Sequence, residues 1–140
     1  MRQVLTLLLL ASLLLSGASR AEIVVVASNR SGPIELTREQ AEKLYLGRSV
    51  TLGDGTPISL VDLPNGTLRD DFYLKLTGKN PAQIQAYWSH LVFTGRALPP
   101  REAASVAEAR QWLGNTPNLI GYLDRTDLTS NMRILIRLHC

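Results

Sequence analysis

The sequence predicts an α/β domain with a mainly parallel sheet flanked by helices. Apolar, β-branched stretches alternate along the chain with stretches whose apolar residues recur every three or four positions, and alternating strands and helices of this kind favour a parallel sheet. The length of 140 residues leaves room for one domain. Apolar residues make up 45% of the chain and charged residues 19%, so this domain can bury a core.

Residues 1–21 are expected to be a cleavable signal peptide. One arginine precedes an apolar run at 4–15, and these 12 residues are fewer than the about 20 that a membrane-spanning helix needs. Ser19 and Ala21 are small residues in the pattern that a signal peptidase reads, which predicts cleavage after Ala21. The mature domain, residues 22–140, is therefore expected in the periplasm without a stable membrane span. An uncleaved anchor is the alternative.

Removal of the leader changes the charge balance. The chain has 15 lysines and arginines against 12 acidic residues, and Arg2 and Arg20 lie in the leader, so the mature domain keeps 13 basic residues and a net charge of +1. A nearly neutral domain lacks the broad positive surface that binds phosphate backbones, which excludes nucleic acid as a partner. The single cysteine, Cys140, excludes an internal disulfide and leaves a disulfide-linked homodimer as one alternative.

The first strand and the first helix of the domain are predicted within residues 22–47. Residues 22–28 form an apolar, β-branched run, which is typical of a buried parallel strand. Thr37 followed by Gln40 is a capping box, so a short helix is expected to begin there. Gly47 predicts the end of this helix.

The second strand and the second helix follow a turn. A Gly-Asp-Gly-Thr-Pro turn at 53–57 precedes the apolar residues 58–63, which predict the strand. A helix is expected to begin near Thr67, because apolar residues at every fourth position from Leu68 onward would share one face. Gly78 predicts its end.

A third helix is the most strongly patterned element. Asn80 predicts its cap, Pro81 suits its first position, and the apolar residues within 84–92 follow the full helical spacing. Gly95 predicts its end, and the two prolines at 99–100 predict an extended connection.

The last helix and two further strands complete the predicted domain. Ser105 with Glu108 is a capping box that opens the helix. Residues 119–123 predict a third strand, and residues 133–138 alternate apolar and polar side chains, which predicts a half-exposed or edge strand.

Two segments are expected where the ligand of such a domain would bind. Open α/β sheets bind ligands beyond the carboxyl ends of their strands. The segment 28–31, which contains Ser28 and Arg30, follows the first strand, and the segment 64–67 follows the second. We therefore expect both segments at the same edge of the sheet.

A series of short motifs spans nearly all of the mature domain. In order, they are the 53–57 turn, the 58–63 strand, a loop ending in Asn-Gly-Thr at 65–67, Phe72, Trp88, Phe-Thr-Gly at 93–95, Pro-Pro at 99–100, and Leu-Ile-Gly-Tyr-Leu at 119–123. This order resembles that of phosphate-type periplasmic solute-binding proteins, whose loop ends in Ser-Gly-Thr. The chain is thus similar to short phosphate ABC transporter substrate-binding-like proteins.

This resemblance implies a fold and a function. Full members of the family have two lobes that clamp the ligand, whereas a chain of this length corresponds to a single lobe of a type 2 periplasmic-binding protein. The implied function is that of an exported, non-catalytic, ABC transporter-associated protein that binds phosphate or a similar small oxyanion.

Asn65, Gly66 and Thr67 are the principal candidates for binding that anion, and Ser28 and Arg30 complete the predicted set. The amino terminus of a helix carries about half a positive charge and unpaired N–H groups. A glycine there lets the backbone approach an oxyanion, and the threonine hydroxyl can donate to it. The other interpretation is that these three residues form only a turn and a helix cap.

The resemblance leaves the alignment of this loop open. An alignment on the strand places Asn65 at the serine of the family, and an alignment on Phe72 places Gly66 there. The binding arginine of the family then falls on Val61 or Asp62, and an aspartate would repel phosphate. Arg30, Arg69 and Arg96 are the basic residues that could replace that arginine.

No pattern in the sequence predicts catalysis, a metal or a cofactor. The chain has no nucleotide-binding fingerprint or phosphate loop, and His90 has no suitably spaced partners. We therefore expect a protein that is not an enzyme. The main alternative is an envelope protein–protein interaction module, in which a lobe that has lost its ligand docks an envelope partner against its open face.

Overall fold

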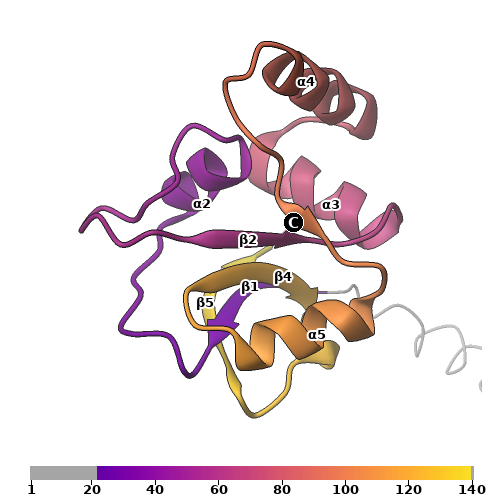
Figure 1. Cartoon of the computed structure of the whole chain (residues 1–140). Coiled ribbons are helices and arrows are strands. Elements are labelled where there is room, and N and C mark those ends of the chain that lie inside the picture. Colours follow the sequence, from indigo (N-terminus) through magenta and orange to yellow (C-terminus); the bar gives the residue numbers. More distant parts are fainter. Residues whose placement is uncertain (1–21, 140) are drawn as a thin grey trace, which may run out of the picture.

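The computed structural model describes residues 22–139, so the predicted signal peptide and Cys140 lie outside the described residues. The described part is a mixed α/β fold with a five-stranded sheet flanked by helices (Figure 1). Its elements, in chain order, are β1 (Ile23–Ser28), α2 (Arg38–Tyr45), β2 (Ser59–Asp62), α3 (Thr67–Thr77), α4 (Pro81–Phe93), β3 (Arg101–Glu102), α5 (Val106–Asn115), β4 (Leu119–Asp124), the short 3-10 helix η1 (Arg125–Asp127) and β5 (Met132–Leu138).

The sheet is mixed rather than mainly parallel. Its strand order is β3-β2-β4-β1-β5. Strand β2 runs parallel to β3 and β4, whereas β1 runs antiparallel to both of its neighbours, β4 and β5. The prediction of a parallel first strand is therefore wrong in direction. All six residues of β1 are buried because helices cover both faces of the sheet, and this burial produces an unbroken apolar run whatever the strand direction.

Two neighbouring residues of β4 show that helices cover both faces of the sheet. Successive side chains of a strand point to opposite faces. A Cβ at Gly121 would meet the side chain of Leu113 on α5 at 2.8 Å. The next residue, Tyr122, stacks on Phe72 of α3 with a centroid distance of 3.6 Å. Helices α5 and α3 thus lie on opposite faces.

The predicted helix starts are confirmed. Thr37 of α2 and Asn80 of α4 each form the complete capping box, and the Ser105 side chain accepts a hydrogen bond from the Glu108 amide at the start of α5. The carboxyl end of α3 is also confirmed, since Gly78 adopts φ 74°, a left-handed conformation that favours glycine.

The two edges of the sheet differ in how well the sequence predicts them. Strand β5 lies at one edge, as its alternating pattern predicts. The other edge is β3, a two-residue strand that the sequence indicated only as an extended connection after the prolines. It pairs Arg101 with Val61 and Glu102 with Asp62.

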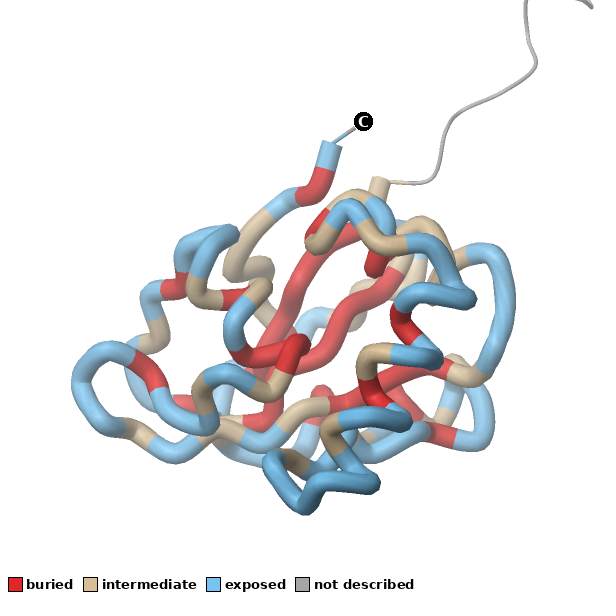
Figure 2. Tube along the Cα trace, turned by 90° about the horizontal axis from the view of Figure 1, so that it is seen from above, coloured by how far each residue is buried: buried red, intermediate tan, exposed pale blue. Residues whose placement is uncertain are grey.

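Buried residues concentrate on the strands at the centre of the molecule, and the outer surfaces of the helices and the loops are exposed (Figure 2). The largest buried side chains include a cluster of four aromatic residues, Tyr45, Phe72, Tyr73 and Tyr122. Among residues 22–139, no helix combines the length and the apolar character needed to cross a bilayer.

Candidate functional site

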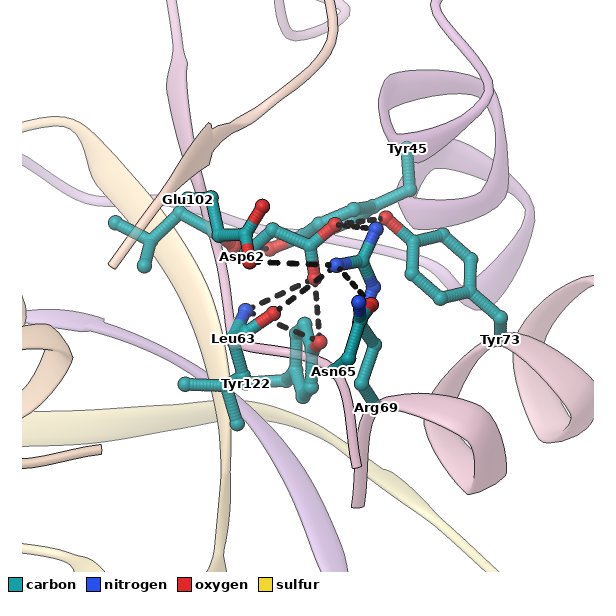
Figure 3. A network of polar contacts seen from close by, with 9 residues as sticks. Tyr45, Asp62, Leu63, Asn65, Arg69, Tyr73, Glu102 and Tyr122 are labelled. Atoms are coloured by element: carbon teal, nitrogen blue, oxygen red, sulfur yellow. Dashed lines mark hydrogen bonds and ion pairs between the residues drawn. The ribbon is translucent and has the colours of Figure 1, made fainter. Parts of the chain in front are cut away.

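A groove of about 1130 Å³ lies beside the carboxyl end of β2, between α3 and α4. Its polar end is lined by Asp62, Asn65, Gly66, Arg69, Asp70, Tyr73 and Glu102. Its remaining walls come from Pro81, Ala82, Ile84, Gln85, Trp88, Ser89, Val92 and Phe93 of α4 and from Pro99 and Pro100. Figure 3 shows the polar end from close by.

Asp62 is the buried centre of the polar end, with only 3% of its surface exposed. One carboxylate oxygen, Oδ1, accepts hydrogen bonds from the Leu63 amide at 2.9 Å and from the Tyr122 hydroxyl. The other, Oδ2, accepts a hydrogen bond from the Tyr73 hydroxyl at 2.6 Å. These donors favour the charged carboxylate, but burial has the larger effect and raises the pKa of Asp62 above its usual range.

The raised pKa predicts how Asp62 affects stability. The folded protein holds this proton more tightly than the unfolded chain, so the contribution of Asp62 to the free energy of unfolding is largest at acid pH. This contribution is lost as the pH rises through the folded-state pKa of Asp62. In Asp62→Asn no proton is exchanged, and the amide oxygen can still accept a hydrogen bond.

We therefore expect the stability of Asp62→Asn relative to the unsubstituted protein to increase with pH, at no more than about 1.4 kcal/mol per pH unit. Urea denaturation of both proteins between about pH 4 and pH 7 measures this difference. The assignment of a raised pKa is wrong if the difference is constant or decreases with pH.

Arg69 on the first turn of α3 is the basic residue of the groove, and 22% of its side chain is exposed. Its Nη2 lies 3.5 Å from Asp62 Oδ2, and its Nη1 lies 3.7 Å from Glu102 Oε1. Nη1 also donates to the Asn65 side-chain oxygen at 3.1 Å and to the Leu63 carbonyl at 3.4 Å (Figure 3). The guanidinium group thus connects the loop after β2, the buried carboxylate and β3.

The start of α3 differs from the starts of α2, α4 and α5 because no side chain caps it. Its N-cap residue is Gly66, with an extended backbone at φ 164° and ψ 179°. The first N–H groups of a helix have no acceptor within the helix. Uncapped amides at a helix start, together with a neighbouring guanidinium, are the groups that bind oxyanions in proteins.

The structure separates the two predicted binding segments. Asn65 and Gly66 line the groove, and Thr67, the first residue of α3, is exposed and does not line it. The buried Ser28 donates a hydrogen bond to the Gly114 carbonyl at 3.3 Å and accepts one from the Arg30 amide at 3.0 Å, and Arg30 is exposed.

The expectation that both segments share one edge is wrong, and the reversed direction of β1 is the reason. Ser31 at the end of the first segment accepts a hydrogen bond from the amide of Asn118, and the Asn118 carbonyl accepts one from the amide of Ser59. Asn118 precedes β4 and Ser59 begins β2, so Ser28 and Arg30 lie at the amino ends of these strands. Asn65 and Gly66 follow their carboxyl ends.

Of the three arginines considered from the sequence, only Arg69 lines the groove. Arg30 lies at the opposite edge, and Arg96 is exposed in the loop after α4. A sequence signal for Arg69 exists, since it lies on the first turn of the predicted helix, directly after the Asn-Gly-Thr loop at 65–67. The roles of Tyr73, Tyr122 and Glu102 around Asp62 have no comparable local signal.

Trp88 of α4 is a buried aromatic residue, with 8% of its surface exposed. It also lines the groove, and its buried indole Nε1–H has no hydrogen-bond acceptor among residues 22–139. Within the same part of the chain, no group of three or more histidine, cysteine, aspartate or glutamate side chains is arranged to hold a metal ion.

No family model and no curated protein matches the sequence. Two solved structures are similar in fold. One is described as a phosphate ABC transporter substrate-binding protein with bound phosphate from Clostridium perfringens, with a TM-score of 0.62, 15% identity and coverage of 82% of this chain. The other is an ABC-type phosphate transport receptor from Vibrio cholerae, with a TM-score of 0.51, 13% identity and the same coverage.

The chain spans less than half of each of these structures, 45% of the first and 46% of the second. At these identities the similarity concerns the fold. The lobe-like architecture predicted from the order of the motifs is thereby confirmed. The described chain therefore has a binding-protein-like α/β fold.

Proposed function

We propose that this chain is an exported, non-catalytic solute-binding-like protein that binds phosphate or a similar small oxyanion at the start of α3. The observation that carries this proposal is the uncapped helix start at Gly66 beside the Arg69 guanidinium, at the polar end of a groove. Asn65 contributes to the same end by holding Arg69 at 3.1 Å. The two solved structures of similar fold, both described by their relation to phosphate transport, support the choice of ligand.

The carboxylates of the groove limit the affinity to be expected. Arg69 is also paired with Asp62 and Glu102, so an oxyanion competes with both for the guanidinium group. Burial raises the pKa of Asp62, which makes its charge easier to remove when an anion binds nearby. A groove open to solvent on one lobe also buries a small ion incompletely. We therefore expect weak, saturable binding.

Thermal unfolding in sodium chloride, sodium phosphate and sodium sulfate at matched ionic strength tests the proposal. A ligand that binds only the folded state adds about 2.7 kcal/mol of stability at a concentration 100 times its Kd. We expect the unfolding midpoint to rise by several degrees more in phosphate or sulfate than in chloride at equal ionic strength. We expect this rise to be larger in the unsubstituted protein than in Arg69→Gln, because exclusion of these salts stabilises both proteins alike. Identical midpoints in all three salts would contradict oxyanion binding.

A second candidate function is the envelope protein–protein interaction module. The observation in its favour is the exposure of two large apolar side chains. Phe93, at 91%, lines the groove, and Leu98, at 87%, directly precedes the two prolines that line it. Exposed apolar surface of this kind is common where proteins meet a partner. This function predicts that cross-linking recovers a protein partner and that phosphate and sulfate raise the unfolding midpoint no more in the unsubstituted protein than in Arg69→Gln.

A further inference from the structure

The groove is much larger than a tetrahedral oxyanion requires. Its volume is about 1130 Å³, whereas a water molecule in the liquid occupies about 30 Å³. Pockets that bind organic molecules usually have volumes of about 300–1,000 Å³, with mostly apolar walls and a few polar groups. The groove has that character, because its charged groups gather at the Arg69 end and its α4 wall is mostly apolar, with Gln85 and Ser89 as the polar side chains there.

The apolar wall of the groove is formed mainly by α4. Ile84 and Trp88 of α4 are buried, and they continue into Val92 and Phe93 on its last turn. Val92 is 49% exposed and Phe93 is 91% exposed. Burying such side chains against an apolar ligand is favourable in proportion to the apolar area removed from water. An inorganic ion held at Arg69 would gain nothing from them.

Trp88 adds a polar group to this apolar wall. It lines the groove, and its buried Nε1–H has no acceptor among the described residues. A buried donor without an acceptor costs free energy, and a shift of the indole ring that exposes Nε1 to the groove would let an oxygen atom of a ligand satisfy it. This observation is independent of the start of α3.

The charges of the groove restrict the solute further. Arg69 is its one basic side chain, and Asp62, Asp70 and Glu102 are its acidic ones. Asp62 and Glu102 already pair with Arg69, so a second negative charge on the solute would find no free basic partner in the groove and would be repelled by these carboxylates. The solute that fits therefore has one oxyanion group at Arg69 and an uncharged body along α4.

We infer that the solute is an organic oxyanion, a phosphate monoester or a molecule of similar chemistry, whose apolar body lies on Trp88 and Phe93. This inference rests on the proposed function, since Arg69 and the start of α3 hold the anionic group. The groove then selects the body of the solute as well as its anionic head group.

Calorimetric titration of the purified protein with inorganic phosphate, phenyl phosphate and benzyl alcohol tests the inference. We expect phenyl phosphate to bind at least tenfold more tightly than phosphate, and benzyl alcohol to bind more weakly than phenyl phosphate. Phe93→Ala is expected to bring the ratio of the two phosphate affinities close to one. Val50→Ala is the matched control, because Val50 is 72% exposed and lies outside the groove, and it should leave this ratio unchanged.

The possible failures of this experiment are distinguishable. If phosphate binds as tightly as phenyl phosphate, the inference is wrong and the proposed function stands. If neither phosphate compound binds, both are wrong. If benzyl alcohol binds as tightly as phenyl phosphate, the groove does not recognise an anionic group, which also overturns the inference. Sedimentation of the same samples is the last test. A dimer that disappears in Phe93→Ala would show that a second copy of the chain covers the groove, which would overturn the inference.

Discussion

Replacement of Phe72 by alanine is expected to lower the free energy of unfolding by about 3–5 kcal/mol. Phe72 is fully buried between α3 and the sheet, and its ring stacks on Tyr122 at a centroid distance of 3.6 Å. It also meets Tyr45 at 4.8 Å and Tyr73 at 5.2 Å in edge-to-face contacts. Truncation removes the packing of three neighbours at once and leaves a cavity beneath the tyrosines that hold Asp62.

Urea denaturation of Phe72→Ala and of Leu74→Ala measures this effect against a control on the same helix. Leu74 is 52% exposed, and truncation of a surface residue usually changes stability by no more than about 0.5 kcal/mol. If the Phe72 variant does not fold, Phe72→Leu provides a smaller change at the same site. Equal stabilities of the Phe72 and Leu74 variants would show that the aromatic cluster does not hold α3 on the sheet.

The helices of this protein are predictable from sequence because their determinants are local. The Thr37 and Asn80 capping boxes each depend on residues three positions apart, and both form as predicted. Gly78 likewise ends α3 through its own backbone conformation. Interactions within one turn of the chain are enough to determine these boundaries.

Strand direction is not local, and the prediction for β1 is wrong for that reason. Ile23 to Ala27 are completely buried, since β1 lies inside the sheet with a helix layer on each face. An apolar run reports this burial but not the direction of the neighbouring strands. The error then placed Ser28 and Arg30 at the carboxyl ends of β2 and β4 instead of their amino ends.

The polar end of the groove could be predicted only in part. Asn65 and Gly66 were identified because a glycine-containing loop before a helix is itself a local pattern. The surroundings of Asp62 depend instead on contacts between distant parts of the chain. Tyr122 lies 60 positions away in sequence, and Glu102 reaches the site through the pairing of β3 with β2. No spacing rule in a single sequence reports such contacts.

Replacement of Arg69 by glutamine is expected to weaken oxyanion binding by at least tenfold. A hydrogen bond to a charged group contributes about 1.5–3 kcal/mol, and about 1.4 kcal/mol corresponds to tenfold in affinity. The substitution also leaves Asp62 and Glu102 without their common partner, which adds repulsion of an anion. Both effects act in the same direction.

Two further variants separate this effect from a general loss of charge or of stability. Arg69→Lys keeps the charge but loses the planar, forked arrangement of donors, so its affinity is expected to lie between those of the unsubstituted protein and the glutamine variant. Arg96→Gln removes an equal charge from an exposed loop that does not line the groove, and it should bind like the unsubstituted protein.

Calorimetric titration of phosphate into the unsubstituted protein, Arg69→Gln and Arg96→Gln, each shown to be folded, is the most direct test of oxyanion binding at the start of α3. The predicted result is saturable binding by the unsubstituted protein and by Arg96→Gln, with at least a tenfold loss for Arg69→Gln. Equal binding by all three proteins would place the anion elsewhere, and the absence of binding in the unsubstituted protein would contradict the account.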